Sequence, residues 1–127
     1  MNVHESGEMY LEAILVLSHK NGFVRSVDVS EYLGYSKPSV SRAMRILRSG
    51  DYVDVDENGG LTLTDSGREI AEKIFERHTL LSQLLMHLGV PEGTAIADAC
   101  KMEHAISDES FQALKRHMAE QMKEKPV

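Results

Sequence analysis

Apolar residues recur at helical spacing in the first part of the chain. Between Met9 and Leu17 they fall on one face of a helix, and Asn21-Gly22 follows with residue types that commonly end a helix. The pattern predicts a helix from Ser6 to about Lys20.

Two shorter helices are predicted next, each with a capping residue before it and a glycine after it. Ser26 is the expected N-cap of the first, which ends at Gly34. Ser36 is the expected N-cap of the second, which carries Pro38 in its first turn and ends at Ser49-Gly50.

A β-hairpin is predicted after these helices. Residues 52–56 and 61–64 alternate apolar and polar side chains, and the turn between them contains Asn58-Gly59-Gly60. Helix, short helix, turn, helix and hairpin is the order of a winged helix-turn-helix. The third helix is then the recognition helix, because residues 37–50 carry four basic residues and no acidic one.

The remainder of the chain is predicted to be helical. The longest helix, capped by Asp65 or Ser66, continues to Leu88 with a wide apolar stripe. Two more helices are expected over residues 92–104 and 108–123, the last capped by Ser107. The predicted fold is mostly α, with a winged helix-turn-helix DNA-binding lobe over residues 1–65 and an all-helical lobe over residues 66–127.

Composition adds two constraints. The 127 residues carry a formal net charge of −6, so the chain is unsuited to coating nucleic acid non-specifically, and the basic third helix contrasts with the rest. A single cysteine permits no internal disulfide, and the sequence suggests neither a signal peptide nor a membrane-spanning run. We therefore expect a cytoplasmic protein without a membrane partner.

One stretch near the C-terminus, "DACKMEHAISDES", groups residue types that bind metals. Cys100, Glu103 and His104 would share one face of a helix, since residues three and four apart are neighbours. Met9 and Glu12 have the same relation on the first helix. Ordinary interpretations stay open for each: a methionine is usually core packing, a lone cysteine is usually a small buried hydrophobe, and the cluster could be a capped helix end.

The sequence resembles the diphtheria toxin repressor family of metal-dependent regulators and its shorter manganese transport regulator branch. Five stretches carry the resemblance in order along nearly the whole chain: "EMYLEAI", "SKPSVSRAMRIL", "GLTLTDSGREIA", "RHTLLSQLL" and "ACKMEHAISDE". The resemblance implies a homodimeric transcriptional repressor, not an enzyme, which binds palindromic operator DNA when loaded with Fe(II) or Mn(II) and controls metal-uptake genes. It further implies that residues 66–127 serve dimerisation and metal binding, in a short form without the C-terminal barrel-like domain of longer members.

The resemblance also implies a set of metal ligands. Positions used by iron-type members are occupied by Met9, Cys100, Glu103 and His104. Positions used by manganese-type members are occupied by Glu12 and His78. Because thioether and thiolate ligands disfavour Mg(II) and Ca(II), we favour Fe(II), with Mn(II) as the alternative, and Zn(II), Co(II) or Ni(II) could substitute in vitro.

The recognition helix suggests a division of contacts with DNA. Its first turn is small and polar, which would bring the backbone close to a groove. Contacts with base edges are predicted for Ser36, Pro38, Ser39 and Arg42. Contacts with phosphates are predicted for Arg25, Lys37, Ser41, Arg45 and Arg48, although basic residues on an exposed helix can also be a solvated face.

Two other functions fit parts of the sequence. A winged-helix regulator could sense a small organic effector or the oxidation of Cys100, in which case Glu103→Ala would leave regulation intact while Cys100→Ser would abolish it. A metalloenzyme is the third interpretation, because cysteine, glutamate and histidine also bind catalytic zinc. No H-E-x-x-H pattern or phosphate loop supports an enzyme, and the basic helix would be unexplained.

Overall fold

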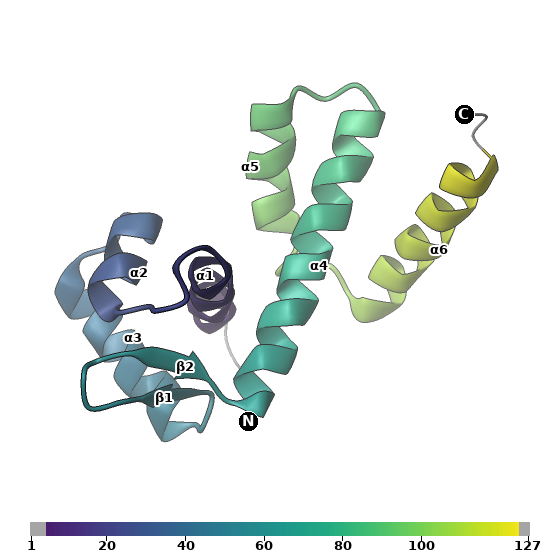
Figure 1. The fold of residues 1–127 in the computed structure, drawn as a ribbon. Coiled ribbons are helices and arrows are strands. Elements are labelled where there is room, and N and C mark those ends of the chain that lie inside the picture. The colour runs from purple at the N-terminus through teal and green to yellow at the C-terminus, as the bar shows by residue number, and fades with distance from the viewer. Residues whose placement is uncertain (1–4, 125–127) are drawn as a thin grey trace. The chain divides into compact units, whose positions relative to one another are not determined.

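The computed structural model describes residues 5–124, which form two compact units that divide between Lys73 and Ile74. The elements of the first unit are α1 (Glu5–Asn21), α2 (Ser26–Leu33), α3 (Lys37–Ser49), β1 (Val53–Val55) and β2 (Leu61–Leu63). Helix α4 (Asp65–His87) begins in the first unit and continues into the second, which also contains α5 (Glu92–Met102) and α6 (Asp108–Glu124). The mostly helical fold with a small hairpin confirms the predicted class (Figure 1).

Several helix ends follow the predicted local chemistry. Gly22 and Gly34 adopt left-handed backbone angles, with φ of 76° and 74°, directly after α1 and α2. Ser36 caps α3, where its hydroxyl oxygen accepts the N–H of Ser39 at 3.3 Å. Ser107 caps α6 in the same way by accepting the N–H of Ser110 at 3.1 Å.

Two predicted caps lie one or two residues too late in the chain. Arg25, not Ser26, is the N-cap of α2, because its backbone is extended and its N–H donates to the carboxylate of Asp28 at 2.9 Å. Thr64 precedes α4, and its hydroxyl oxygen accepts the N–H of Gly67 at 3.1 Å, so neither Asp65 nor Ser66 is the cap. The two bonds run in opposite directions: the backbone N–H of Arg25 donates to the side chain three residues later, whereas the side chain of Thr64 accepts the N–H three residues later.

The hairpin is built as predicted, with shorter strands. Its antiparallel register pairs Val53 with Leu63 and Val55 with Leu61. The carboxylate of Asp56 accepts the N–H groups of Asn58 and Gly60, both at 2.8 Å, which fixes the turn at the tip. The acidic wing therefore uses one of its carboxylates to hold its own backbone.

The first unit has an apolar core centred on α1. Leu11, Ile14 and Leu15 are almost completely buried, together with Val29 of α2 and Val40 of α3. The unit thereby holds α3 by its apolar face and leaves the opposite face in solvent.

The second unit departs from the prediction at the end of α5. That helix ends at Met102 and not at His104, and Glu103 is its C-cap. The N–H groups of Ala105 and Ile106 both donate to the carbonyl of Met102 at 3.0 Å, so the chain closes into a tight turn before α6. In the described part of the chain, no helix combines the length and apolar character needed to cross a bilayer.

Candidate metal centre and nucleic-acid interface

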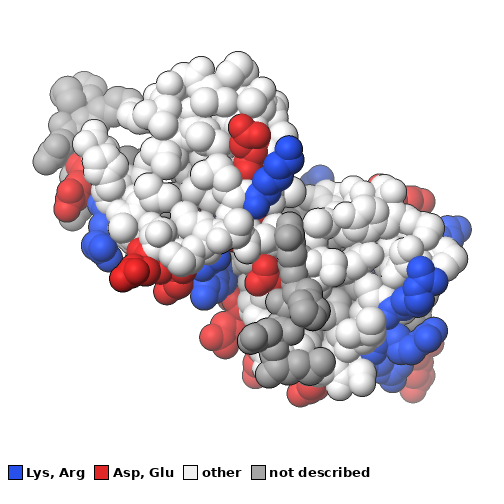
Figure 2. Space-filling view, turned by 180° about the vertical axis from the view of Figure 1, so that it is seen from behind, with Lys and Arg blue, Asp and Glu red and all other residues white. Residues whose placement is uncertain are grey.

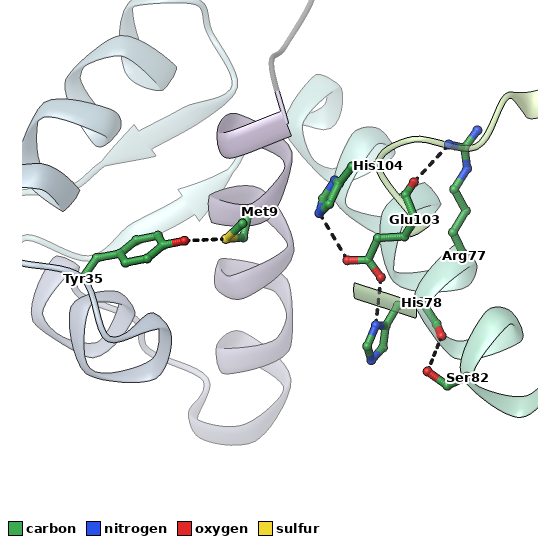
Figure 3. Close-up of polar contacts among 7 residues, drawn as sticks. All are labelled: Met9, Tyr35, Arg77, His78, Ser82, Glu103 and His104. Atoms are coloured by element: carbon green, nitrogen blue, oxygen red, sulfur yellow. Dashed lines mark hydrogen bonds and ion pairs between the residues drawn. The ribbon is translucent and has the colours of Figure 1, made fainter. Parts of the chain in front are cut away.

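The carboxylate of Glu103 is the centre of a buried polar cluster in the second unit. Its side chain has no exposed surface, and one oxygen, Oε2, lies 2.8 Å from Nδ1 of His78. The other oxygen, Oε1, lies 3.3 Å from Nε2 of His104, whose side chain is 1% exposed. Figure 3 shows the two imidazole rings pointing at opposite oxygens of this carboxylate.

Three elements of local structure place these side chains. His78 lies in the middle of α4, where Ser82 donates its hydroxyl to the His78 carbonyl at 2.7 Å. Glu103 is the C-cap of α5, and His104 follows in the tight turn. The end of α5 thus turns Glu103 inward while Cys100, in the last turn of the same helix, is exposed.

The chemistry of this cluster fits a first-row divalent cation. Two imidazoles and one carboxylate supply nitrogen and oxygen donors, a set that suits Mn(II), Fe(II), Co(II) or Zn(II). A carboxylate taken completely out of water is costly unless cations or hydrogen-bond donors surround it, so its burial also indicates a specific role. His78, Glu103 and His104 would hold the ion, which would supply positive charge to neutralise the carboxylate.

The remaining candidate ligands have different surroundings. Met9 and Glu12 lie on α1 in the first unit, and both are partly buried. The hydroxyl of Tyr35 donates to the sulfur of Met9 at 3.1 Å, a contact visible in Figure 3. Met9 is therefore partnered by the residue directly before Ser36, the cap of α3, and is not simply core packing.

Tyr35 also packs against Tyr10 of α1. Their ring centroids are 5.9 Å apart in an edge-to-face arrangement. Burial of the Tyr10 hydroxyl raises its pKa, the nearby Tyr35 raises it further, and Arg42 acts in the opposite direction. The start of α3 is thus attached to α1 through both aromatic and sulfur contacts.

The exposed face of α3 carries the predicted DNA-binding residues. The Ser36 hydroxyl donates to the Ser39 oxygen at 2.8 Å, and a guanidinium nitrogen of Arg42 donates to the same oxygen at 3.3 Å. These contacts join the polar side chains of Ser36, Ser39 and Arg42 to one another at the start of α3. The other exposed candidates on this helix are Lys37, Pro38, Ser41, Arg45 and Arg48.

The basic residues gather on one side of the first unit. In Figure 2, Lys and Arg side chains cluster at the right-hand edge of that unit, where α3 lies. Arg25 is exposed at the start of α2, with its guanidinium 5.0 Å from the ring centroid of Phe23. A basic, exposed helix held on a rigid apolar core is suited to entering a DNA groove.

Arg77 was missed by the sequence analysis. It is 7% exposed and donates to the carbonyls of Glu103 and Ile106 in the turn that carries the cluster. A signal was available: Arg77 follows Ile74 by three residues and precedes Leu81 by four, so it interrupts the apolar stripe of α4. A charged residue at a core position is rarely buried unless it is paired.

Comparison with known sequences gives matches over both units. Residues 2–61 match the N-terminal DNA-binding domain of iron-dependent repressors, and residues 64–126 match the metal-binding and dimerisation domain of the same proteins. A helix-turn-helix transcriptional regulator of Methanocaldococcus jannaschii, itself uncharacterized, is 36% identical over 123 residues, covering 95% of this chain and 98% of the relative. The transcriptional regulator MntR of Geobacillus kaustophilus is 34% identical over 102 residues, covering 80% of this chain and 72% of MntR.

A solved structure supports the same grouping. A manganese-dependent transcriptional repressor in complex with manganese has 30% identity and a TM-score of 0.82, covering 89% of this chain and 52% of that protein. The chain therefore spans about half the length of this solved relative.

Proposed function

Because this chain belongs to the iron-dependent repressor family, we propose that it is a homodimeric transcriptional repressor that binds operator DNA when loaded with a divalent metal. The observation that supports this most directly is the match of both family domains, one after the other, over residues 2–61 and 64–126. The first domain contributes α3 and the second contributes the buried cluster around Glu103. Such a protein acts in the cytoplasm, where the DNA is.

We propose that the metal centre includes His78, Glu103 and His104, with further ligands from the set inferred by resemblance. Those further ligands are Met9, Glu12 and Cys100. Bound metal would neutralise acidic side chains in a protein whose formal net charge is −6. Less negative charge favours approach to phosphates, and a fixed arrangement of ligands would restrict the positions of the two recognition helices.

Fe(II) is the metal we favour, because the ligand set includes the soft sulfur atoms of Met9 and Cys100. Mn(II) is the second candidate, supported by the harder nitrogen and oxygen donors gathered around Glu103 and by the manganese-dependent relative. Zn(II), Co(II) or Ni(II) would bind the same donors in vitro. Metal availability in the cell then decides between ions of similar affinity.

For DNA, we propose that the dimer binds a palindromic site, with one α3 helix in each half-site. Ser36, Pro38, Ser39 and Arg42 would contact base edges from the first turns of the helix. Arg25, Lys37, Ser41, Arg45 and Arg48 would contact phosphates. The regulated genes would be those of metal uptake, so that excess metal would repress the genes for its own uptake.

Anaerobic DNA binding is the decisive experiment. Wild type, Cys100→Ala and Glu103→Gln would be titrated against a promoter fragment of a metal-uptake gene from the same genome, with Fe(II), Mn(II), Zn(II) or a chelator. The exposed Glu109 supplies a matched control, Glu109→Gln. Binding that needs metal and is lost in Glu103→Gln, but not in Glu109→Gln, supports the proposal and ranks the ions.

Binding that is indifferent to the chelator would contradict metal dependence. A regulator that senses oxidation would instead lose its response in Cys100→Ala and keep it in Glu103→Gln. The exposure of Cys100 makes this comparison informative, because the thiol is accessible to an oxidant without unfolding.

A further inference from the structure

Arg77 is a charged residue in the interior of the second unit. Its neighbours along the apolar stripe of α4, Ile74 and Leu81, are 2% and 0% exposed, and Arg77 itself is 7% exposed. Burying a guanidinium is costly, so its contacts should account for its place.

Those contacts all go to the turn between α5 and α6 and to the first turn of α6. One guanidinium nitrogen, Nη1, donates to the carbonyl of Glu103 at 3.2 Å and to the carbonyl of Ile106 at 2.9 Å. The other, Nη2, lies 3.5 Å from a carboxylate oxygen of Asp108. The guanidinium also lies 5.5 Å from the ring centroid of Phe111, which is 1% exposed.

This arrangement fixes both ends of a short backbone segment. The last carbonyls of a helix have no partner within it, and here Arg77 binds the carbonyl of the C-cap residue and one three residues later. His104 lies between these two anchored positions. The direction in which Glu103 and His104 point therefore depends on Arg77.

Glu103 is held from α4 at two places. Arg77 binds its backbone carbonyl, and His78, the next residue along α4, contacts its carboxylate at 2.8 Å. A contact that only joined α4 to the turn after α5 could lie anywhere along α4. The contact made by Arg77 lies directly beside His78, so it lies at the polar cluster (Figure 3).

We propose that Arg77 is the positioning residue of the metal centre: by holding the carbonyls of Glu103 and Ile106, it sets the donors of Glu103 and His104 for a divalent cation. The inference rests on the proposed function, because it requires that this cluster binds metal. Arg77 itself acts through the backbone of the turn and contributes no ligand.

Lysine cannot replace arginine in this role. Arg77→Lys keeps the positive charge, but a single ammonium on a flexible stem does not reproduce the planar fork that reaches two carbonyls and a carboxylate. Loss of groups that orient metal ligands typically costs about 10–100-fold in metal affinity. We expect a loss in that range for Co(II) binding by Arg77→Lys.

The test uses the full chain and Co(II), whose visible absorption bands report coordination geometry. Wild type and Arg77→Lys would be titrated with Co(II) under anaerobic conditions, and thermal unfolding of the metal-free proteins would be measured in parallel. Arg116→Lys, at an exposed position of α6, is the control for the substitution itself. Ile74→Val, at a buried position of the same unit, is the control for a general loss of stability.

The expected result is weaker Co(II) binding with shifted or weakened visible bands in Arg77→Lys, while both controls keep the wild-type affinity and spectrum. If Arg77→Lys binds Co(II) with wild-type affinity and spectrum, or differs from wild type only as much as Ile74→Val does, the positioning role is wrong although the metal site stands. If wild type binds no Co(II) and gains no stability from Mn(II) or Fe(II), the proposed function fails and this inference fails with it. Should Arg77→Lys not fold, Asp108→Asn removes one contact of the guanidinium and should give a smaller change in the same direction, and an unchanged spectrum there would also overturn the inference.

Discussion

The two units keep their charges in different places. In the first unit, the core around α1 is made of apolar side chains, and the basic residues of α3 lie in solvent. In the second unit, the side chains of Arg77, Glu103 and His104 are buried and contact one another or the same turn.

The difference follows from what each unit would bind. Phosphates and base edges are reached from a surface, so basic side chains for DNA must stay exposed. A metal ion exchanges bound water for protein donors, so those donors must converge on one point. Substitution of a basic residue on the exposed face of α3 should therefore change a surface with little effect on folding, whereas substitution of Arg77, Glu103 or His104 should change geometry inside the second unit.

The largest expected effect is the loss of metal affinity when Glu103 is replaced. Glu103→Gln keeps the shape of the side chain but removes the charge that both imidazoles contact. We expect metal affinity to fall by more than the roughly 10–100-fold that loss of an outer-shell partner costs. Metal at a hundred times its Kd stabilises a protein by about 2.7 kcal/mol, so the metal-induced rise in Tm should disappear in Glu103→Gln.

Thermal unfolding with and without Mn(II) or Fe(II) measures this effect, with Glu109→Gln as the control. A full metal-induced rise in Tm in Glu103→Gln would place the metal elsewhere. It would also remove the functional explanation for a buried carboxylate in the second unit.

Arg42 should give the next largest effect, and only on DNA. Arg42→Ala removes a guanidinium held at the start of α3 by Ser39. We expect about 1–3 kcal/mol less discrimination between operator and random DNA, with unchanged metal affinity. Fluorescence anisotropy with both DNA sequences measures it, and equal losses on the two would show that Arg42 contacts phosphate and not bases.

Arg48 should show the complementary behaviour. Arg48→Ala is expected to weaken operator and random DNA alike and to lower the slope of log K against log salt concentration by about one. The measurement is DNA affinity over a range of KCl concentrations. Arg116→Ala, at an exposed position in the second unit, controls for net charge. An unchanged salt slope would remove Arg48 from the interface.

Substitution of Ser36 tests how much an exposed helix cap contributes to the stability of the first unit. Ser36→Ala removes the hydroxyl that accepts the N–H of Ser39, and loss of an N-cap typically costs about 1 kcal/mol. All four tyrosines lie before residue 53, so tyrosine fluorescence during urea unfolding reports on the first unit. Ser49→Ala, at the other end of α3, should have little effect, and equal effects of the two substitutions would contradict a capping role.

Local patterns predicted the fold of the first unit closely. Ser36, Asn58-Gly59-Gly60 and Gly34 each perform the role that their residue types suggest, because capping and turn geometry depend on a few neighbouring residues. The caps at Arg25 and Thr64 were misplaced by one or two residues, because several adjacent polar residues could accept or offer the same bond.

The sequence predicted that Cys100, Glu103 and His104 share one helix face, whereas in the structure Cys100 is exposed and Glu103 contacts His78 and His104. The end of α5 at Met102 has no glycine or proline to mark it, and the C-cap residue Glu103 contacts Arg77, 26 residues earlier in the chain. The contact between Tyr35 and Met9 also joins residues 26 apart. Helical spacing identifies neighbours within one helix and cannot identify such partners.

The smallest expected effect concerns Tyr10 at high pH. Because burial raises the pKa of its hydroxyl, the folded state binds this proton more tightly than the unfolded state, whose tyrosines titrate near pH 10. The stabilising contribution is therefore complete below about pH 10 and is lost as the pH rises through the folded-state pKa. Ionised Tyr10 would place a charge in the apolar core of the first unit. In the second unit, by contrast, the buried charges of Arg77 and Glu103 lie beside polar or oppositely charged groups.

Urea unfolding of wild type and Tyr10→Phe between about pH 8 and pH 11 measures this difference, because only wild type can ionise at position 10. Above about pH 10, the stability of wild type should fall more steeply with pH than the stability of Tyr10→Phe. Tyr52→Phe, at a partly buried position beside the hairpin, serves as the comparison. Parallel pH profiles for wild type and Tyr10→Phe would mean that the Tyr10 hydroxyl remains in water, and that the first unit tolerates an ionisable group because its core does not enclose it.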